Sequence, residues 1–379
     1  MRCVVLYAYP PEPDGQSLQG HLLYQGILNA KEEAWPCHFK ESIQKDFYLK
    51  HVKLDVSYGI GFWGNVPEIV VEPLKRKVNP VPWFNSDGWV ANYQEEFNKL
   101  DLMFTTSDWV KSVYKRDGVD VSKIVPMHIG VDTDTFRPKN DVKLRKAIRK
   151  MMGVKDKEKM ILTVGGDVTS KGAQEMIKAL SEINQEFKDW KYICKSWPSE
   201  CADGWRESEL ELADNLGVGD KVTFIDDEFS PEFMAELLNA TDIYAAPSRL
   251  EGYGMIQVEA MSCGKPVISI NKMGPSETIV HNKTGFLAKV GKTIKLDSEW
   301  VYPWMGFKEK KKIKFDSPKT MAYRADIEDL KKYTLKLLTE DTLREKMGKQ
   351  AREHVLKKLD YRHIAQQIVD ITKERLDLK

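Results

Sequence analysis

The sequence predicts an α/β protein made of two doubly wound domains, each with a parallel sheet that helices cover on both sides. The chain has 379 residues, enough for two domains of ordinary size. Short apolar runs typical of buried strands alternate with amphipathic helical segments along most of the chain. Glycine-containing turns follow several of these runs, as expected where a parallel strand leads into a helix beside a ligand.

The net charge and the cysteine content argue against some classes of protein. Lysine and arginine total 58 and aspartate and glutamate 57, so the net charge of +1 argues against a nucleic-acid binder that relies on bulk charge. The five cysteines show no C-x-x-C spacing, and we expect reduced thiols and no structural zinc. The first residues lack a signal-peptide pattern, and no run approaches eighteen apolar residues. We expect a cytoplasmic protein, and a peripheral contact with a membrane stays open.

The first domain opens with a strand over residues 3–8. A turn-rich loop then carries Asp14 and Gly15, and a helix follows with apolar residues at helical spacing, which are Leu18, Leu22, Leu23 and Ile27. Further on we expect a helix around 90–100, a strand over 102–106 and a helix over 108–116. Ser107 is a suitable N-cap for the last helix, and Gly118 ends it.

Residues 59–64 satisfy the dinucleotide fingerprint G-x-G-x-x-G. That fingerprint requires a helix that begins at the glycines. Residues 66–71 instead suggest another strand, with Pro67 at its entrance. We therefore reject a nicotinamide site and interpret the glycines as a tight turn facing an interdomain cleft, or as a plain loop.

The second domain shows the most regular alternation of strand and helix. A basic, helical segment over 140–159 precedes it, and within it Ser230 followed by Pro231 is typical of a helix start. Strands are expected over residues 161–164, 192–194, 222–225, 243–246 and 267–270. This alternation predicts a parallel sheet covered on both faces.

One turn of the second domain has the chemistry of an anion site. It follows the apolar run at 243–246, and a helix begins after it near Met255. Gly252 and Gly254 allow the backbone to approach a ligand closely, so the amides that open the helix can point at a diphosphate.

Two glutamates flank this turn. Glu251 lies at its mouth, and Glu259 lies inside the helix, where a carboxylate can accept both hydroxyls of a ribose. The pair, eight positions apart around a glycine turn, resembles the pattern of retaining GT-B glycosyltransferases of family 4, the glycosyl transferases group 1. Residues 272–287 resemble the family's next glycine loop, short helix and Thr-Gly-Phe-Leu strand entry. Residues 124–138 resemble its Gly-Val-Asp turn and Phe-x-Pro exit.

The resemblance implies the GT-B fold, with two Rossmann-like domains that face a cleft. Residues 1–155 would form the acceptor-binding domain, with the C-terminal helix of about 361–379 packed back on it. Residues 156–360 would form the nucleotide-sugar-binding domain, with an insertion at about 290–324.

The resemblance also implies a donor site. In the loop at 165–172, Lys171 matches a family lysine that grips the donor diphosphate, but Gly166 stands where the family has an arginine. Either Arg249 or backbone amides at Gly166 would then supply the second contact. Glu251 and Lys171 are expected to act at the reacting centre, and no metal ligand is expected. The expected donor-binding residues are Gly15, Gly166, Lys171, Arg249, Gly252, Tyr253, Gly254, Met255 and Glu259.

The implied activity is metal-independent transfer of a sugar, with retention at the anomeric carbon. The donor would be a UDP- or GDP-sugar, without a further cofactor, and the acceptor the hydroxyl of a glycan, a lipid-linked compound or a small molecule. Two alternatives stay open: a nucleotide-sugar binding protein, suggested by the missing arginine, and a nucleotide-sugar epimerase of the same fold.

The insertion at 290–324 departs from the family pattern. Trp300, Tyr302 and Trp304 precede a lysine-rich run at 308–314. One interpretation is a surface for an anionic acceptor or for lipid headgroups. The other, which the composition alone favours, is a solvated β-hairpin with a lysine-rich edge.

Overall fold

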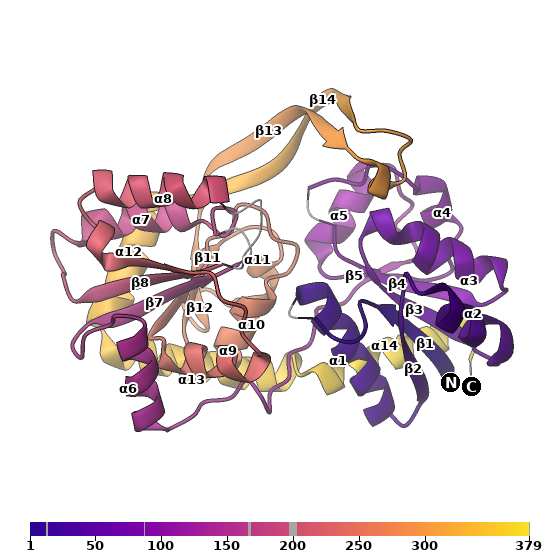
Figure 1. The fold of residues 1–379 in the computed structure, drawn as a ribbon, viewed down its shortest axis with the longest axis horizontal. Coiled ribbons are helices and arrows are strands. Elements are labelled where there is room, and N and C mark those ends of the chain that lie inside the picture. The colour runs from indigo at the N-terminus through magenta and orange to yellow at the C-terminus, as the bar shows by residue number, and fades with distance from the viewer. Residues whose placement is uncertain (13, 87, 166–167, 197–202, 379) are drawn as a thin grey trace. The chain divides into compact units, whose positions relative to one another are not determined.

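The computed structural model describes residues 1–379 apart from 13, 87, 166–167, 197–202 and 379 (Figure 1). The chain divides into two compact units. Unit 1 comprises Met1–Asp132, Lys295–Met321 and Lys358–Lys379, and unit 2 comprises Thr133–Ile294 and Ala322–Lys357. Each unit contains one six-stranded parallel sheet, so the predicted α/β class with two doubly wound domains is confirmed.

The sheet of unit 1 has the strand order β2-β1-β3-β4-β5-β6. Helices α1 and α14 pack together on one side, where Gly26 lets Ala365 approach closely, and buried residues of α4 and α5 cover the other. The strands are β1 (Arg2–Tyr7), β2 (Glu33–His38), β3 (Val56–Gly61), β4 (Asn79–Phe84), β5 (Met103–Thr105) and β6 (Ile124–Pro126). The helices are α1 (Gly15–Asn29), α2 (Ser42–His51), α3 (Glu72–Lys75), α4 (Gln94–Asn98), α5 (Asp108–Arg116) and α14 (Tyr361–Leu376).

The sheet of unit 2 has the order β12-β11-β10-β7-β8-β9. Helices α7, α8 and α12 cover one face, and α6, α9 and α10 the other (Figure 1). The strands are β7 (Lys159–Val164), β8 (Trp190–Lys195), β9 (Val222–Ile225), β10 (Ile243–Ala245), β11 (Val267–Ile270) and β12 (Gly285–Ala288). The helices are α6 (Val142–Met151), α7 (Ala173–Ile183), α8 (Asp203–Asn215), α9 (Pro231–Ala240), α10 (Met255–Ser262), α11 (Pro275–Thr278), α12 (Ile327–Thr339) and α13 (Asp341–Lys358).

The strand order places a topological switch point in unit 2. The chain runs outward from β7 through β8 to β9 and then returns to place β10 on the other side of β7. In open α/β sheets, ligands bind at the carboxyl ends of the strands where the order reverses. The loops that leave β7 and β10 therefore lie at the expected ligand edge of this unit.

The glycine segment at 59–64 differs from the prediction. Gly59 and Gly61 lie inside strand β3, and residues Pro67–Val71 form a π-helical turn instead of a strand. A Cβ on Gly59 would stand 2.0 Å from Cγ2 of Ile69, so the glycine allows this turn to pack against β3. The strand predicted over 66–71 and the interpretation of the glycines as a tight turn or loop are therefore wrong, because Gly59 and Gly61 extend a strand and helical turns follow them. The helix expected around 90–100 shrinks to Gln94–Asn98.

The local helix signals are confirmed. The hydroxyl of Ser107 accepts a hydrogen bond from the Val110 amide at 3.1 Å, and Gly118 ends the region with a φ of +93°. The hydroxyl of Ser230 likewise accepts from the Phe233 amide at 3.3 Å, with Pro231 as the first helical residue.

Residues 290–325 form a two-stranded β-hairpin of β13 (Val290–Val301) and β14 (Lys311–Ala325). Its outer part, Lys295–Met321, belongs to unit 1 and its base to unit 2. The hairpin predicted as one interpretation of the insertion is therefore present.

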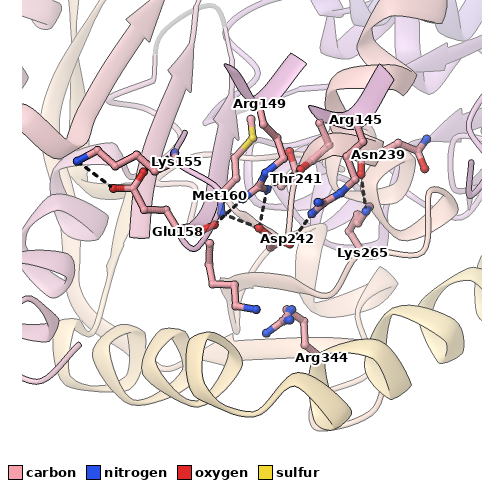
Figure 2. Close-up of polar contacts among 12 residues, drawn as sticks. Arg145, Arg149, Lys155, Glu158, Met160, Asn239, Thr241, Asp242, Lys265 and Arg344 are labelled. Carbon is pink, nitrogen blue, oxygen red and sulfur yellow. Dashed lines mark hydrogen bonds and ion pairs between the residues drawn. The ribbon is translucent and has the colours of Figure 1, made fainter. Parts of the chain in front are cut away.

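A buried charge cluster fixes the amino ends of β7 and β10. Arg145 and Arg149 of α6 point toward Asp242 and each donates to its carboxylate at 2.8 Å (Figure 2). The Met160 amide donates to the same carboxylate at 2.7 Å. Nearby, Nζ of Lys265 donates to the Asn239 carbonyl at 2.8 Å. Burial of the ammonium lowers the pKa of Lys265 to about 8, although the negative charge of Asp242 acts to raise it.

Four cysteines, Cys3, Cys37, Cys194 and Cys263, are buried free thiols, and Cys201 lies outside the described residues. None of the helices that the structure describes is both long enough and apolar enough to span a membrane.

Candidate functional site

Two glycine loops meet at the switch point of unit 2. Residues 165–172 connect β7 to α7, and residues 246–254 connect β10 to α10. The Arg249 amide donates to the Ser170 carbonyl at 2.7 Å. Gly172 has a φ of +84°, and a Cβ there would lie 2.4 Å from the Pro247 carbonyl oxygen. The two loops are therefore held against each other, and Gly172 is needed for that contact.

Lys171 and Glu251 come together from these two loops. Nζ of Lys171 lies 2.7 Å from Oε2 of Glu251, and their side chains are 25% and 13% exposed. The Ser248 hydroxyl donates to the same carboxylate oxygen at 3.3 Å. The stem of Lys171 crosses Gly165, where a Cβ would stand 2.4 Å from the lysine Cγ. Ser248 and Gly165 thus position the two members of the ion pair, and both side chains remain partly exposed to solvent.

The start of α10 presents backbone amides to the same edge. Gly254 precedes the helix with a φ of +98°, and Met255 is its first residue. The first amides of a helix have no partner within the helix, and its dipole favours an anion there. The backbone at Gly274 lies directly against this turn. A Cβ on Gly274 would lie 2.4 Å from the Gly252 carbonyl oxygen and 2.5 Å from Cα of Tyr253, so only a glycine allows this close approach.

Glu259 is a buried acidic residue of α10. It is 3% exposed, and its carboxyl group has no hydrogen-bond or ion-pair partner among the residues that the structure describes. Burial raises its pKa to about 8. Burial, with the charges of Glu251 and Glu259 as smaller causes, raises the pKa of the Tyr244 phenol well above its ordinary value. A buried carboxyl group without a partner is costly, and a ligand with hydroxyl donors would relieve that cost.

Arg249 has different partners from those expected. Its Nη2 donates to Oε1 of Glu175 at 3.0 Å and to Gln174 at 2.9 Å, and its side chain is 11% exposed. Glu175 is 3% exposed and also pairs with Arg324 at 3.2 Å. Nε and Nη2 of Arg249 are thus directed at the side chains of Glu175 and Gln174. The donor contact of Arg249 therefore stays a prediction.

Two further predicted residues fall elsewhere. Gly15 belongs to unit 1, where it is the exposed first residue of α1 behind the N-cap Asp14. Gly166 lies outside the described residues. The roles of both stay predictions.

Sequence reasoning missed three residues that shape the site: Gly165, Glu175 and Ser248. Ser248 lies inside the segment that predicted the site, so a search for hydroxyls beside Glu251 would have found it. Glu175 occupies the first turn of α7, where an acid ordinarily complements the helix dipole, and no local pattern indicates its partner 74 positions away.

A family model described as Glycosyl transferases group 1 matches residues 145–298. The chain is 30% identical over 186 residues to D-inositol 3-phosphate glycosyltransferases of Mycobacterium tuberculosis and of Mycobacterium bovis. The aligned segment covers 49% of this chain and 37% of the length of those relatives.

Solved structures resemble the whole chain. A sucrose-phosphate synthase from Thermosynechococcus elongatus superposes with a TM-score of 0.73 at 15% identity, covering 99% of both chains. HepE of Anabaena, in complex with UDP and glucose, superposes with a TM-score of 0.74 at 13% identity, covering 99% of this chain and all of that one. A glycosyltransferase from Rickettsia africae has a TM-score of 0.72 at 18% identity, with full coverage of both chains. Residues 145–298 therefore resemble the glycosyl transferases group 1, and the chain as a whole has the two-domain GT-B fold.

Proposed function

We propose that this protein transfers a sugar from a nucleotide diphosphate sugar to an acceptor hydroxyl, with retention at the anomeric carbon and without a metal ion. The observation that carries the proposal is the meeting of Lys171 and Glu251 at the switch point of unit 2, next to the open start of α10.

The proposed chemistry assigns each group one task. The ammonium of Lys171 and the amides at Gly254 and Met255 would stabilise the departing diphosphate, where negative charge develops. A bound diphosphate would take the place of Glu251 beside Lys171. The freed Glu251 carboxylate would then hold hydroxyls of the transferred sugar, and Glu259 those of the ribose.

The donor and the acceptor are proposed at the level of chemical class. UDP is the first nucleotide to test, because HepE of Anabaena has been solved with UDP and with UDP-glucose. GDP is the second. The acceptor would be a glycan, a lipid-linked compound or a small molecule, and the protein would work in the cytoplasm with a peripheral membrane contact.

The test is product analysis of the full chain with a panel of UDP- and GDP-sugars, with and without chelator, and with NMR to assign the new anomeric centre. We expect a product that keeps the donor's anomeric configuration and forms equally well with chelator. The Glu251→Gln variant, which keeps the shape of the side chain, should still bind UDP and lose turnover. If none of the nucleotides or nucleotide sugars raises the melting temperature, the proposal is wrong.

A second candidate is a nucleotide-sugar binding protein without transferase activity. It is favoured by one observation: Arg249, a candidate replacement for the missing family arginine, is held by Glu175. Tight UDP-sugar binding without any product, hydrolysed or epimerised sugar included, would support this candidate. An epimerised sugar formed without an acceptor would instead indicate an epimerase.

A further inference from the structure

The outer part of the hairpin, Lys295–Met321, carries aromatic side chains that face solvent. Trp300 and Trp304 are 43% and 60% exposed. Their neighbours join them into one aromatic strip: Tyr302 stacks on Trp304 with 5.9 Å between ring centroids, and Phe62 meets Trp304 edge-on at 5.6 Å. Nζ of Lys310 lies 5.0 Å from the Trp300 ring and 5.2 Å from the Tyr302 ring.

The same part of the hairpin concentrates positive charge. Five of the seven residues at 308–314 are lysines and one is Glu309, although the whole chain is almost neutral. Within the described part of the chain, none of these five lysines forms a salt bridge with a carboxylate. Lys310 and Lys311 contact aromatic rings instead. The charge at this place is therefore available to a partner.

The opposite face of the hairpin packs against other residues of unit 1. Phe315 is 8% exposed and packs on Trp89, with 4.9 Å between ring centroids. Nζ of Lys319 lies 2.6 Å from Oδ1 of Asp117, whose side chain is 1% exposed. Arg116 donates to the Thr320 carbonyl at 3.0 Å. These contacts hold the hairpin in place on unit 1, so its exposed strip is a fixed surface rather than a loose loop.

We propose that this strip docks the protein on the surface of an anionic lipid bilayer. Tryptophan and tyrosine rings prefer the headgroup level of a membrane, and lysine stems bury their methylenes while the ammonium stays at the phosphates. Adsorption to a bilayer gains from apolar area and from attraction to anionic lipids together. A soluble polyanion would use the lysines and leave the two indoles without a role. The inference rests on unit 1 and does not depend on the proposed donor.

The test is sedimentation of the full chain with vesicles of phosphatidylcholine alone and of phosphatidylcholine with phosphatidylglycerol in equal amounts. We expect binding to the mixed vesicles, little to phosphatidylcholine alone, and release as the salt concentration rises. The Lys312→Gln/Lys314→Gln and Trp300→Ala/Trp304→Ala variants should each lower the partition coefficient about tenfold or more.

Matched controls change the same chemistry elsewhere. The Lys143→Gln/Lys146→Gln variant removes two exposed lysines of α6, and Phe47→Ala removes an aromatic side chain that is 54% exposed. Both should sediment like the unchanged protein, and all variants should keep its melting temperature. The proposal is overturned if binding is equal on both kinds of vesicle, if the hairpin variants bind as the controls do, or if dextran sulfate binds while the vesicles do not.

Discussion

Lys171 and Glu251 form an ion pair that a bound diphosphate would have to divide, and this makes the lysine the most direct single-residue probe of the site. The Lys171→Met variant keeps most of the stem that crosses Gly165 and removes the charge. A charged hydrogen bond contributes about 1.5–3 kcal/mol, so we expect the Kd for UDP to rise about tenfold to a hundredfold, measured by calorimetry.

Uridine and a surface variant provide the controls for this prediction. Uridine has no phosphate, so its affinity should be the same for Lys171→Met and for the unchanged protein. Lys143→Met, which alters an exposed lysine of α6, should change neither affinity. Equal losses for UDP and uridine would show that Lys171 supports the fold of the loop and does not contact the diphosphate.

Glu259 predicts a pH dependence of donor binding. Its pKa is raised to about 8 in the free protein, so the carboxyl group is largely protonated at neutral pH. Accepting two ribose hydroxyls favours the ionised form, so UDP binding would release a proton. The affinity for UDP should therefore rise as pH increases from about 7 to 8 and level off above that value.

The Glu259→Gln variant tests this origin, since an amide of the same shape has no proton to release. Its affinity for UDP should be lower and should not vary over the same pH range. Calorimetry in buffers with different ionisation enthalpies measures the released proton directly. An affinity that stays constant or falls with rising pH in the unchanged protein would contradict the assignment of Glu259 to the ribose.

At the scale of the elements, Glu175 connects helix α7 to the 246–254 loop by an ion pair with Arg249. This buried carboxylate pairs with Arg249 of the loop and with Arg324 at the end of β14. Removing one partner of a buried pair typically costs about 3–5 kcal/mol, because it leaves the other charge uncompensated. Glu175→Ala should therefore lower the free energy of unfolding by about 3 kcal/mol in chemical denaturation.

A more exposed pair on the same helix is the matched control. Glu182 lies 3.4 Å from Lys331 and its side chain is 44% exposed, so Glu182→Ala should change stability by less than about 1 kcal/mol. Adding Arg249→Met to Glu175→Ala should restore part of the loss. Similar values for Glu175→Ala and Glu182→Ala would show that the buried pair does not hold the loop.

The elements also show where sequence patterns succeed and fail. Strands β9 and β11 and helix α5 have the predicted bounds, and for α5 the cap at Ser107 and the glycine at 118 mark its two ends. Helix α14 begins at the predicted Tyr361 and ends at Leu376, before the predicted end at about 379. Strand β4 contains Pro80 and Pro82, and prolines argue against an interior strand. On one side β5 pairs only with Trp83 and Phe84, beyond the prolines, while β3 pairs along the whole of β4 on the other side.

The site was predictable where the chemistry lies within one short segment. Glu251, Gly254 and Glu259 stand together in the sequence, so the turn and the helix start could be predicted without the fold. The Lys171–Glu251 pair joins positions 80 apart, and only the resemblance to a family placed Lys171 there. The Arg249–Glu175 pair has no sequence signal, because a buried salt bridge depends on how two loops pack.

For the molecule as a whole, the charge cluster around Asp242 predicts how stability responds to pH. The pKa of Lys265 is lowered to about 8, so folding must bury an ammonium at any lower pH. Since the unfolded lysine titrates near 10.5, the folded state binds fewer protons between about pH 8 and 10. Below about pH 8, the buried ammonium of Lys265 therefore lowers the free energy of unfolding. This destabilisation decreases as the pH rises from about 8 to 10.

The Lys265→Met variant isolates this contribution from the buried thiols and phenols that titrate in the same range. The variant should be more stable than the unchanged protein at neutral pH. Its advantage should shrink by about 1.4 kcal/mol per pH unit between about pH 8 and 10, measured by urea denaturation. An advantage that does not change with pH would show that the ammonium of Lys265 is solvated in the folded state.

The central claim is that a nucleotide diphosphate binds at the carboxyl ends of β7 and β10, and a crystal structure of the full chain soaked with UDP tests it most directly. The account predicts a phosphate oxygen about 3 Å from Nζ of Lys171 and from the amides at Gly254 or Met255, with the ribose hydroxyls at Glu259. A UDP molecule bound elsewhere on the protein, with the Lys171–Glu251 ion pair intact, would contradict it.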